Sequence, residues 1–258
     1  MKKLLFIGLC FALMLSGCQT ELKMAKAYVA EQPKIEAAVY FPEKAEVKVE
    51  YNPTYGLTNV LQGFIQDLFL DIMYNAYSKT LGHYGVEVYV PEDIENVPVD
   101  SIHWLVLLSR MEISGRITEY EDYLFSDSHD YSYKHPLNTV NVASWFEIND
   151  GEWKPVLYSE QNLIDGFNSK TDHAFWSGKF DYYYTIDTLK LDDVYNFAVY
   201  LGKLYAGYTY DYMMNKHVEE EMKKRNMDYW NQQLLRYDPY KKQLRYAEDD
   251  DFFLEIEE

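Results

Sequence analysis

Two long segments of the chain place apolar residues at intervals of three and four, which is the spacing of an amphipathic helix. In the first, this spacing predicts a helix that begins near Thr58 and ends near Leu81. In the second, it predicts a longer helix over residues 192–224, with Asp192 and Asp193 at the end where the helix dipole favours anions. Each helix has an apolar stripe that must be covered by another element.

Apolar and polar residues alternate elsewhere, which predicts strands. The expected strands cover residues 45–51, 86–90, 103–109 continuing over 112–124, 137–148 and 153–160. Asn149-Asp150-Gly151 predicts a hairpin turn between the last two. Residues 126–136 are expected to form a polar loop, and residues 175–186 fit either a strand or an aromatic loop. The order of elements predicts an α+β fold, with a mainly antiparallel sheet and two long helices packed on one face.

Two smaller patterns predict close packing. Trp145 and Trp153 lie symmetrically about the predicted turn, so they are expected to be cross-strand neighbours. Ala198, Gly202 and Ala206 recur every four residues and form a narrow ridge on the second helix. This ridge favours contact between the helix and its own sheet over contact between two chains.

The start of the chain has the three parts of a secretory signal peptide. Residues 1–3 carry two lysines, residues 4–15 are apolar, and the small residues Ser16 and Gly17 precede Cys18. The apolar run is shorter than the roughly 20 residues that a membrane-spanning helix requires. The pattern therefore favours a removable signal over a permanent membrane span.

The tetrapeptide Leu15-Ser16-Gly17-Cys18 resembles the lipobox of bacterial lipoproteins. The resemblance implies that residues 1–17 are removed and that the Cys18 thiol receives a diacylglycerol anchor. It also implies an outer-membrane location, because Gln19 is not an inner-membrane retention residue in diderm bacteria. Residues 19–23 contain one acid and one base, which favours the periplasmic face slightly over the cell surface.

These patterns divide the chain into four parts. Residues 1–17 are the expected signal peptide, and residues 18–44 are the lipidated N-terminus and a tether, in which the helix formers of residues 22–31 allow a short helix. Residues 45–224 form the α+β domain. Residues 225–258 are an aromatic and acidic C-terminal segment, expected to pack on a partner or back on its own domain.

Composition narrows the choice of partners. The formal charge of −18 disfavours binding to nucleic acid and electrostatic adhesion to lipid, so membrane attachment is expected through the lipid anchor. Cys10 and Cys18 are the two cysteines, so the mature domain has no disulfide and depends on its apolar core. Aromatic residues make up 17% of the chain, and tyrosine suits strands, protein interfaces and sugar platforms alike.

The sequence contains no phosphate loop, dinucleotide fingerprint, nucleophile elbow, zinc-protease helix or paired-cysteine site, so no enzyme activity and no cofactor are expected. The strongest candidate for a metal site is formed by Asp127, His129, Asp130 and His135, because histidine and carboxylate groups bind divalent ions. A solvated loop is the favoured alternative.

The candidate ligand-binding residues are aromatic. Trp176, Tyr182, Tyr183 and Tyr184 offer flat surfaces on which sugar rings stack, although ordinary packing is favoured. We therefore expect a non-enzymatic accessory or scaffold subunit that binds another envelope protein. The alternative is a surface-exposed lipoprotein that binds glycan.

Overall fold

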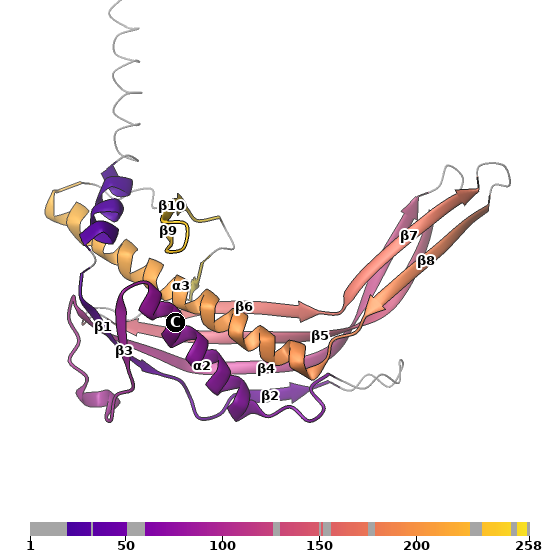
Figure 1. Ribbon diagram of the computed structural model, residues 1–258, viewed down its shortest axis with the longest axis horizontal. Coiled ribbons are helices and arrows are strands. Elements are labelled where there is room, and N and C mark those ends of the chain that lie inside the picture. Colours follow the sequence, from indigo (N-terminus) through magenta and orange to yellow (C-terminus); the bar gives the residue numbers. More distant parts are fainter. Residues whose placement is uncertain are drawn as a thin grey trace, which may run out of the picture.

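The computed structural model describes residues 20–31, 33–50, 60–125, 130–149, 151, 156–174, 179–227, 234–248 and 252–256. They form an α+β fold in which helices cover one face of a mixed sheet and a long arm projects from one end (Figure 1). Within the described residues, no helix combines the length and the apolar character needed to cross a bilayer.

The strands are β1 (Ile35–Tyr40), β2 (Glu46–Val49), β3 (Val86–Tyr89), β4 (His103–Phe125), β5 (Asp130–Asn149), β6 (Val156–Ile164), β7 (Gly166–Ala174), β8 (Lys179–Asp187), β9 (Leu235–Asp238), β10 (Gln243–Tyr246) and β11 (Leu254–Ile256). The helices are α2 (Gln66–His83), α3 (Leu191–Lys224) and a helix over residues 20–31, with a short 3-10 turn, Ile94–Asn96.

The main sheet has the order β11-β6-β5-β4-β1-β3, and β2 also pairs with β4. In the series β11, β6, β5 and β4 each strand is antiparallel to the next, whereas β1 and β2 run parallel to β4, and β3 runs parallel to β1. Two separate hairpins, β7-β8 and β9-β10, complete the fold.

The N-terminal part of the described chain belongs to the packed body, where a tether was expected over residues 18–44. In the helix over residues 20–31, Tyr28 is buried and its ring lies 4.7 Å from that of His217 on α3. Strand β1 lies between β4 and β3, and Ala37 and Val39 are fully buried. A strand that is buried on both faces reads as a short apolar run without alternation, so the alternating pattern did not reveal it.

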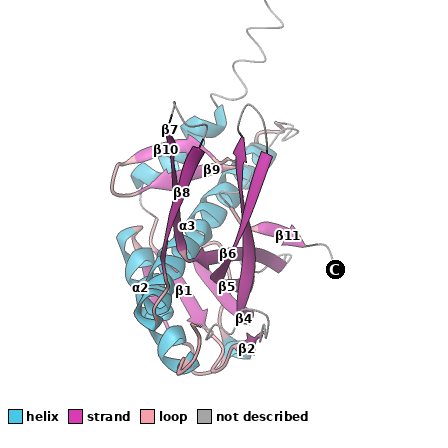
Figure 2. Ribbon diagram, turned by 90° about the vertical axis from the view of Figure 1, so that its right-hand side faces the viewer, coloured by secondary structure: helices cyan, strands magenta, loops and turns pink. Residues whose placement is uncertain are grey.

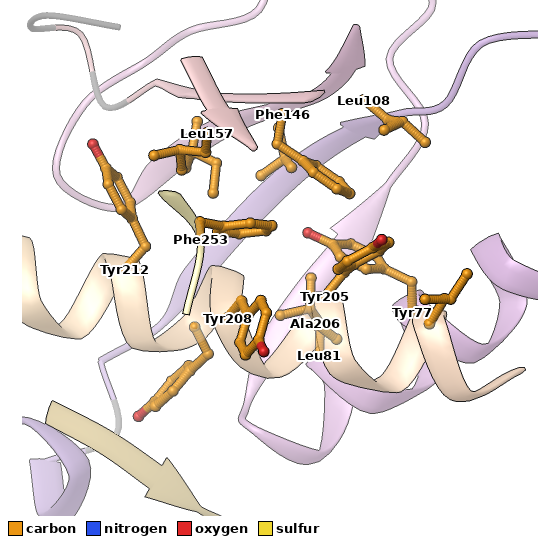
Figure 3. Packing of buried hydrophobic residues seen from close by; sticks show 14 of the residues in the cluster. Tyr77, Leu81, Leu108, Phe146, Leu157, Tyr205, Ala206, Tyr208, Tyr212 and Phe253 are labelled. Atoms are coloured by element: carbon orange, nitrogen blue, oxygen red, sulfur yellow. The ribbon is translucent and has the colours of Figure 1, made fainter. Parts of the chain in front are cut away.

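The core lies between the sheet and helices α2 and α3, and aromatic rings fill much of it (Figure 3). The ring of Phe146 on β5 lies 5.1 Å from both Tyr205 on α3 and Phe253 near the C-terminus. Tyr77 on α2 donates a hydrogen bond to Thr209 Oγ1 at 2.8 Å. The described part of the C-terminal segment therefore packs back on its own domain.

Helices α2 and α3 pack closely at Gly202. A Cβ built on Gly202 would lie 2.9 Å from the Tyr77 nitrogen and from Ala76 Cβ, and closer still to the Met73 carbonyl oxygen. The Ala198-Gly202-Ala206 ridge thus seats α3 against α2, where contact with the sheet was expected.

Helix α2 begins eight residues later than the predicted start at Thr58, which lies outside the described residues. Residues 60–63 form a turn instead, and Gly63 has φ +81°, a conformation that cannot continue a right-handed helix. Helix α3 and strand β3 closely match the predicted segments.

The hairpin predicted at Asn149-Asp150-Gly151 is present as β5 and β6, and Gly151 has φ +97°. Trp145 faces Tyr158 in its register, with ring centroids 5.1 Å apart, where Trp153 was the expected neighbour. Trp153 lies outside the described residues. Strand β6 begins at Val156, three residues after the expected start at residue 153. Trp145 is therefore paired with a later residue than the one expected.

Candidate functional site

The arm consists of two hairpins that lie along one another (Figures 1 and 2). Strands β4 and β5 stay paired from Leu105–Asn149 to Phe125–Asp130, whereas β6 accompanies β5 only as far as Thr139. Beyond that point β4 continues from Arg116 for roughly 30 Å, at about 3.3 Å per residue. Residues 130–136, expected to form a polar loop, are part of β5 in this arm.

Aromatic rings join the two hairpins, because alternate side chains of each strand point toward the other hairpin. The ring contacts are Tyr133–Tyr182 at 4.3 Å, His135–Tyr184 at 4.3 Å, His135–Phe167 at 4.8 Å and Tyr120–Phe167 at 4.8 Å. A single two-stranded ribbon is marginally stable in water. The aromatic contacts let each ribbon stabilise the other.

Hydrogen bonds reinforce this aromatic layer. The Tyr182 hydroxyl donates to Asp122 Oδ2 at 2.9 Å, and His135 Nε2 lies 2.9 Å from the same hydroxyl oxygen. A hydroxyl carries one hydrogen, and the hydrogen of Tyr182 points to Asp122. The His135 ring nitrogen is therefore the donor of the second hydrogen bond, and the Tyr182 oxygen accepts it. Burial, with a smaller contribution from Asp122, raises the pKa of Tyr182 to about 12. Tyr182 therefore stays protonated at neutral pH and links the two hairpins.

Asp165 fixes the base of the arm, between β6 and β7. Its Oδ2 accepts hydrogen bonds from the Asn138 backbone nitrogen at 2.7 Å and from Asn138 Nδ2 at 3.0 Å. Its Oδ1 accepts one from the Leu189 nitrogen at 2.7 Å. One buried carboxylate thus connects the chain entering the second hairpin, the chain leaving it, and β5.

Of the four residues proposed for a metal site, the described structure places the side chain of His135 alone. Asp127 and His129 lie outside the described residues, as does the side chain of Asp130. Asp130 and His135 are both on extended β5, so their Cα atoms are about 16 Å apart. His135 is buried and bonded to Tyr182, and the described residues contain no group of three or more potential metal ligands.

The proposed ligand-binding tyrosines divide between the two faces of β8. Tyr182 and Tyr184 contact the rings of the first hairpin, whereas the alternate residue Tyr183 is 55% exposed. Tyr184 is itself 52% exposed at the margin of the layer. Trp176 and Cys18 lie outside the described residues. The arm thus presents the rings of Tyr183 and Tyr184 to solvent.

Sequence reasoning missed three residues of the aromatic layer. They are Tyr120, Tyr133 and Phe167, which lie on the three different strands β4, β5 and β7. The available signal was the alternation of Tyr131, Tyr133 and His135, which is typical of a strand and was set aside because the segment is polar.

A cavity of about 540 Å³ lies where the arm joins the body. Its aromatic wall is formed by Phe197 and Tyr200 on α3, whose rings are stacked with centroids 5.9 Å apart. The described lining also contains the apolar side chains of Leu163 and Leu189 and several polar ones, among them Gln161, Asn162, Asp187, Asp193 and Asn196. This combination offers a stacking surface beside hydrogen-bonding groups, and none of the described lining residues is basic.

No protein-family model matches the chain, and a comparison with curated proteins finds no match. Among solved structures, the chain is similar to a protein described as a neuraminyllactose-binding hemagglutinin homolog from Helicobacter pylori. The two share 10% identity, and the alignment covers 74% of this chain and 91% of the other, with a TM-score of 0.36. A similarity at this level assigns neither a ligand nor a partner to this chain.

Proposed function

We propose that the protein is a lipid-anchored envelope protein, a non-enzymatic accessory or scaffold subunit whose arm binds another envelope protein. The observation that carries the proposal is the arm itself, a two-hairpin projection with aromatic side chains on its surface. Residues 1–18 support the anchored location, because they resemble a lipoprotein signal. The outer membrane, with the arm in the periplasm, is the location that we propose.

The construction of the arm suits it to binding a protein partner. Its interior is closed by the Tyr182 hydrogen bonds and its base is held by Asp165, so little conformational freedom remains to be lost on binding. Tyr183 and Tyr184 keep more than half of their surface exposed, and Tyr120 keeps 41%. Tyrosine is enriched at protein interfaces, because it combines a flat apolar ring with a polar tip.

Native co-purification in mild detergent tests the proposal. We expect the lipoprotein to bring down a stoichiometric envelope protein, and Tyr183→Ala to reduce that recovery severalfold. Tyr200→Ala is the matched control, because Tyr200 is an equally exposed tyrosine, at 51%, outside the arm. Absence of a stoichiometric partner, or equal loss in both variants, would contradict a binding role for the arm.

The cavity at the base of the arm supports a second candidate, glycan binding. Stacked Phe197 and Tyr200 beside amide and carboxylate groups match the needs of a sugar ring, which combines an apolar face with hydroxyl groups. Here Tyr200→Ala should abolish binding on a glycan array, while Tyr183→Ala should retain it. Protease treatment of intact cells adds a second test, because a surface-exposed domain is digested and a periplasmic one survives.

A further inference from the structure

A second cavity concentrates positive charge in an acidic protein. It has a volume of about 320 Å³ and lies between the end of α2, the middle of α3 and the β9-β10 hairpin. Lys203, Arg236, Lys241 and Arg245 line it, together with one acidic residue, Asp238, whose Oδ2 lies 3.7 Å from Lys241 Nζ. The chain has 24 basic and 42 acidic residues, so four basic side chains around one cavity oppose its overall charge balance.

Two of these residues face each other across the hairpin. Arg236 on β9 and Arg245 on β10 are direct register partners. Like charges directly opposite one another destabilise a two-stranded ribbon unless an anion lies between or beside them. Asp211 supplies one such carboxylate, which lies 2.9 Å from Arg236 Nε and also interacts with Arg245. One carboxylate beside two guanidinium groups leaves positive charge that a second anion would neutralise.

Arg236 is held in place without a ligand. Its Nε donates to Asp211 Oδ2 at 2.9 Å, and its guanidinium carbon lies 4.8 Å from the centre of the Tyr208 ring. Asp211 Oδ1 also accepts a hydrogen bond from the Tyr237 nitrogen at 2.8 Å, which fixes β9 against α3. A guanidinium fixed in this way is preorganised for a second anion.

The Asp211 carboxylate neutralises only part of the positive charge of Arg236 and Arg245. Burial raises the pKa of Asp211 to about 7, against the opposing effects of Arg236, the Tyr237 backbone hydrogen bond and Arg245. Even with Asp211 and Asp238 both charged, the four basic side chains outnumber these two carboxylates beside the cavity.

We propose that this cavity binds a phosphoryl group, contacted by the Arg236 and Arg245 guanidinium groups and by the ammonium groups of Lys203 and Lys241. Arginine presents a planar array of N–H donors that matches phosphate oxygens. Tyr240, which is 71% exposed at the rim, is placed to contact the group that carries the phosphate.

The position of the cavity admits two sources for that phosphate. The β9-β10 hairpin lies beside the helix over residues 20–31, at the end of the body where the described chain begins (Figures 1 and 2). A phospholipid headgroup would reach it there if the lipid anchor holds this end near the bilayer, and a soluble phosphate ester would reach it in either case. The chemistry recognised is the same for both.

Titration calorimetry on the purified full chain, in neutral detergent, tests the proposal with two probes. Glycerol 3-phosphate represents the soluble ester, and short-chain dihexanoyl phosphatidic acid represents the headgroup. We expect saturable binding that weakens about 10-fold or more in Lys241→Gln/Arg245→Gln, because two charge-assisted contacts are lost. The control Lys44→Gln/Lys170→Gln removes the same charge away from the cavity and should bind as the unmodified protein does.

Binding of both probes identifies the phosphoryl group as sufficient, and binding of the lipid alone identifies the headgroup as the ligand. Arg236 is left intact in the test because its loss would leave the buried Asp211 carboxylate without its charged partner. Lys203→Gln, at an exposed position on α3, provides a second variant that does not touch the hairpin and should also weaken binding. Failure of both probes to bind, or equal weakening in the control, would overturn the proposal.

Discussion

Replacement of Gly202 by alanine sets two opposing effects against each other. In an exposed helix this change is favourable by about 1 kcal/mol, because alanine restricts the unfolded chain and suits the helix better. At Gly202 the new methyl group would lie 2.9 Å from the Tyr77 nitrogen and closer to the Met73 carbonyl oxygen. Real Cβ atoms essentially never approach other atoms this closely.

The atoms that the new methyl group meets decide whether Gly202→Ala raises or lowers the free energy of unfolding. The Tyr77 nitrogen and the Met73 oxygen belong to the α2 backbone, so no side-chain rotation relieves the contact. Helices α2 and α3 must separate, which loosens the aromatic core behind them. Overpacking costs about 1–3 kcal/mol and sometimes more, and a backbone obstruction belongs at the upper end. After subtraction of the helix gain, we expect Gly202→Ala to lower the free energy of unfolding by about 2 kcal/mol.

Urea denaturation followed by near-ultraviolet circular dichroism measures this change. Gly82→Ala is the matched control, because Gly82 lies in the last turn of α2 and an added Cβ there would meet nothing within 4 Å. The control should be neutral or more stable by up to about 1 kcal/mol. Equal or increased stability in Gly202→Ala would refute the packing described for the two helices.

Three further predictions concern other parts of the molecule. Because burial raises the pKa of Asp211 to about 7, the folded state holds its proton more tightly than the unfolded chain does. Its contribution to the free energy of unfolding should therefore be complete below about pH 4 and fall as the pH rises to 7. Asp211→Asn should remove this part of the pH dependence, measured by urea denaturation at pH 5 and 8, and an unchanged profile would contradict the assignment. Tyr182→Phe keeps the aromatic contacts but loses two hydrogen bonds, so hydrogen exchange should accelerate in β7 and β8 and stay unchanged in α3. Cys18→Ala should abolish membrane association in cell fractionation, and a variant that remains membrane-bound would show that a partner provides the anchor.

The sequence predicted those elements whose apolar spacing or turn residues lie within the element itself. Helix α3 repeats its apolar spacing over 34 residues, and residues 192–224 were predicted to within one residue of its observed limits. The pairing of β5 with β6 was also predicted, because the turn signal Asn149-Asp150-Gly151 is local, although β6 begins three residues later than expected. The α+β class followed from the order of such elements, although the sheet is mixed and a third helix is present.

The arm was not predictable by the same reasoning. Strand β7 is mostly polar, and Phe167 packs against His135, which is 32 residues away in the sequence. The aromatic layer exists because two polar ribbons meet, and the alternation of Tyr133 and His135 on one ribbon does not show which segment covers them. The convergence of Arg236 and Arg245 was hidden in a similar way, because it depends on the register of a hairpin within the C-terminal segment.

The placement of β1 has a mechanical consequence. A pulling force applied at the N-terminus acts first on the helix over residues 20–31, which packs on α3 through Tyr28, and then on β1, which is hydrogen-bonded to β3 on one side and to β4 on the other. Force along a strand loads these bonds together, in shear, so several must break in the same step. The body and its arm would then move with the point of attachment as one stiff unit. A pulling force on a partner bound to the arm would be transmitted through β4, which runs from beside β1 into the arm.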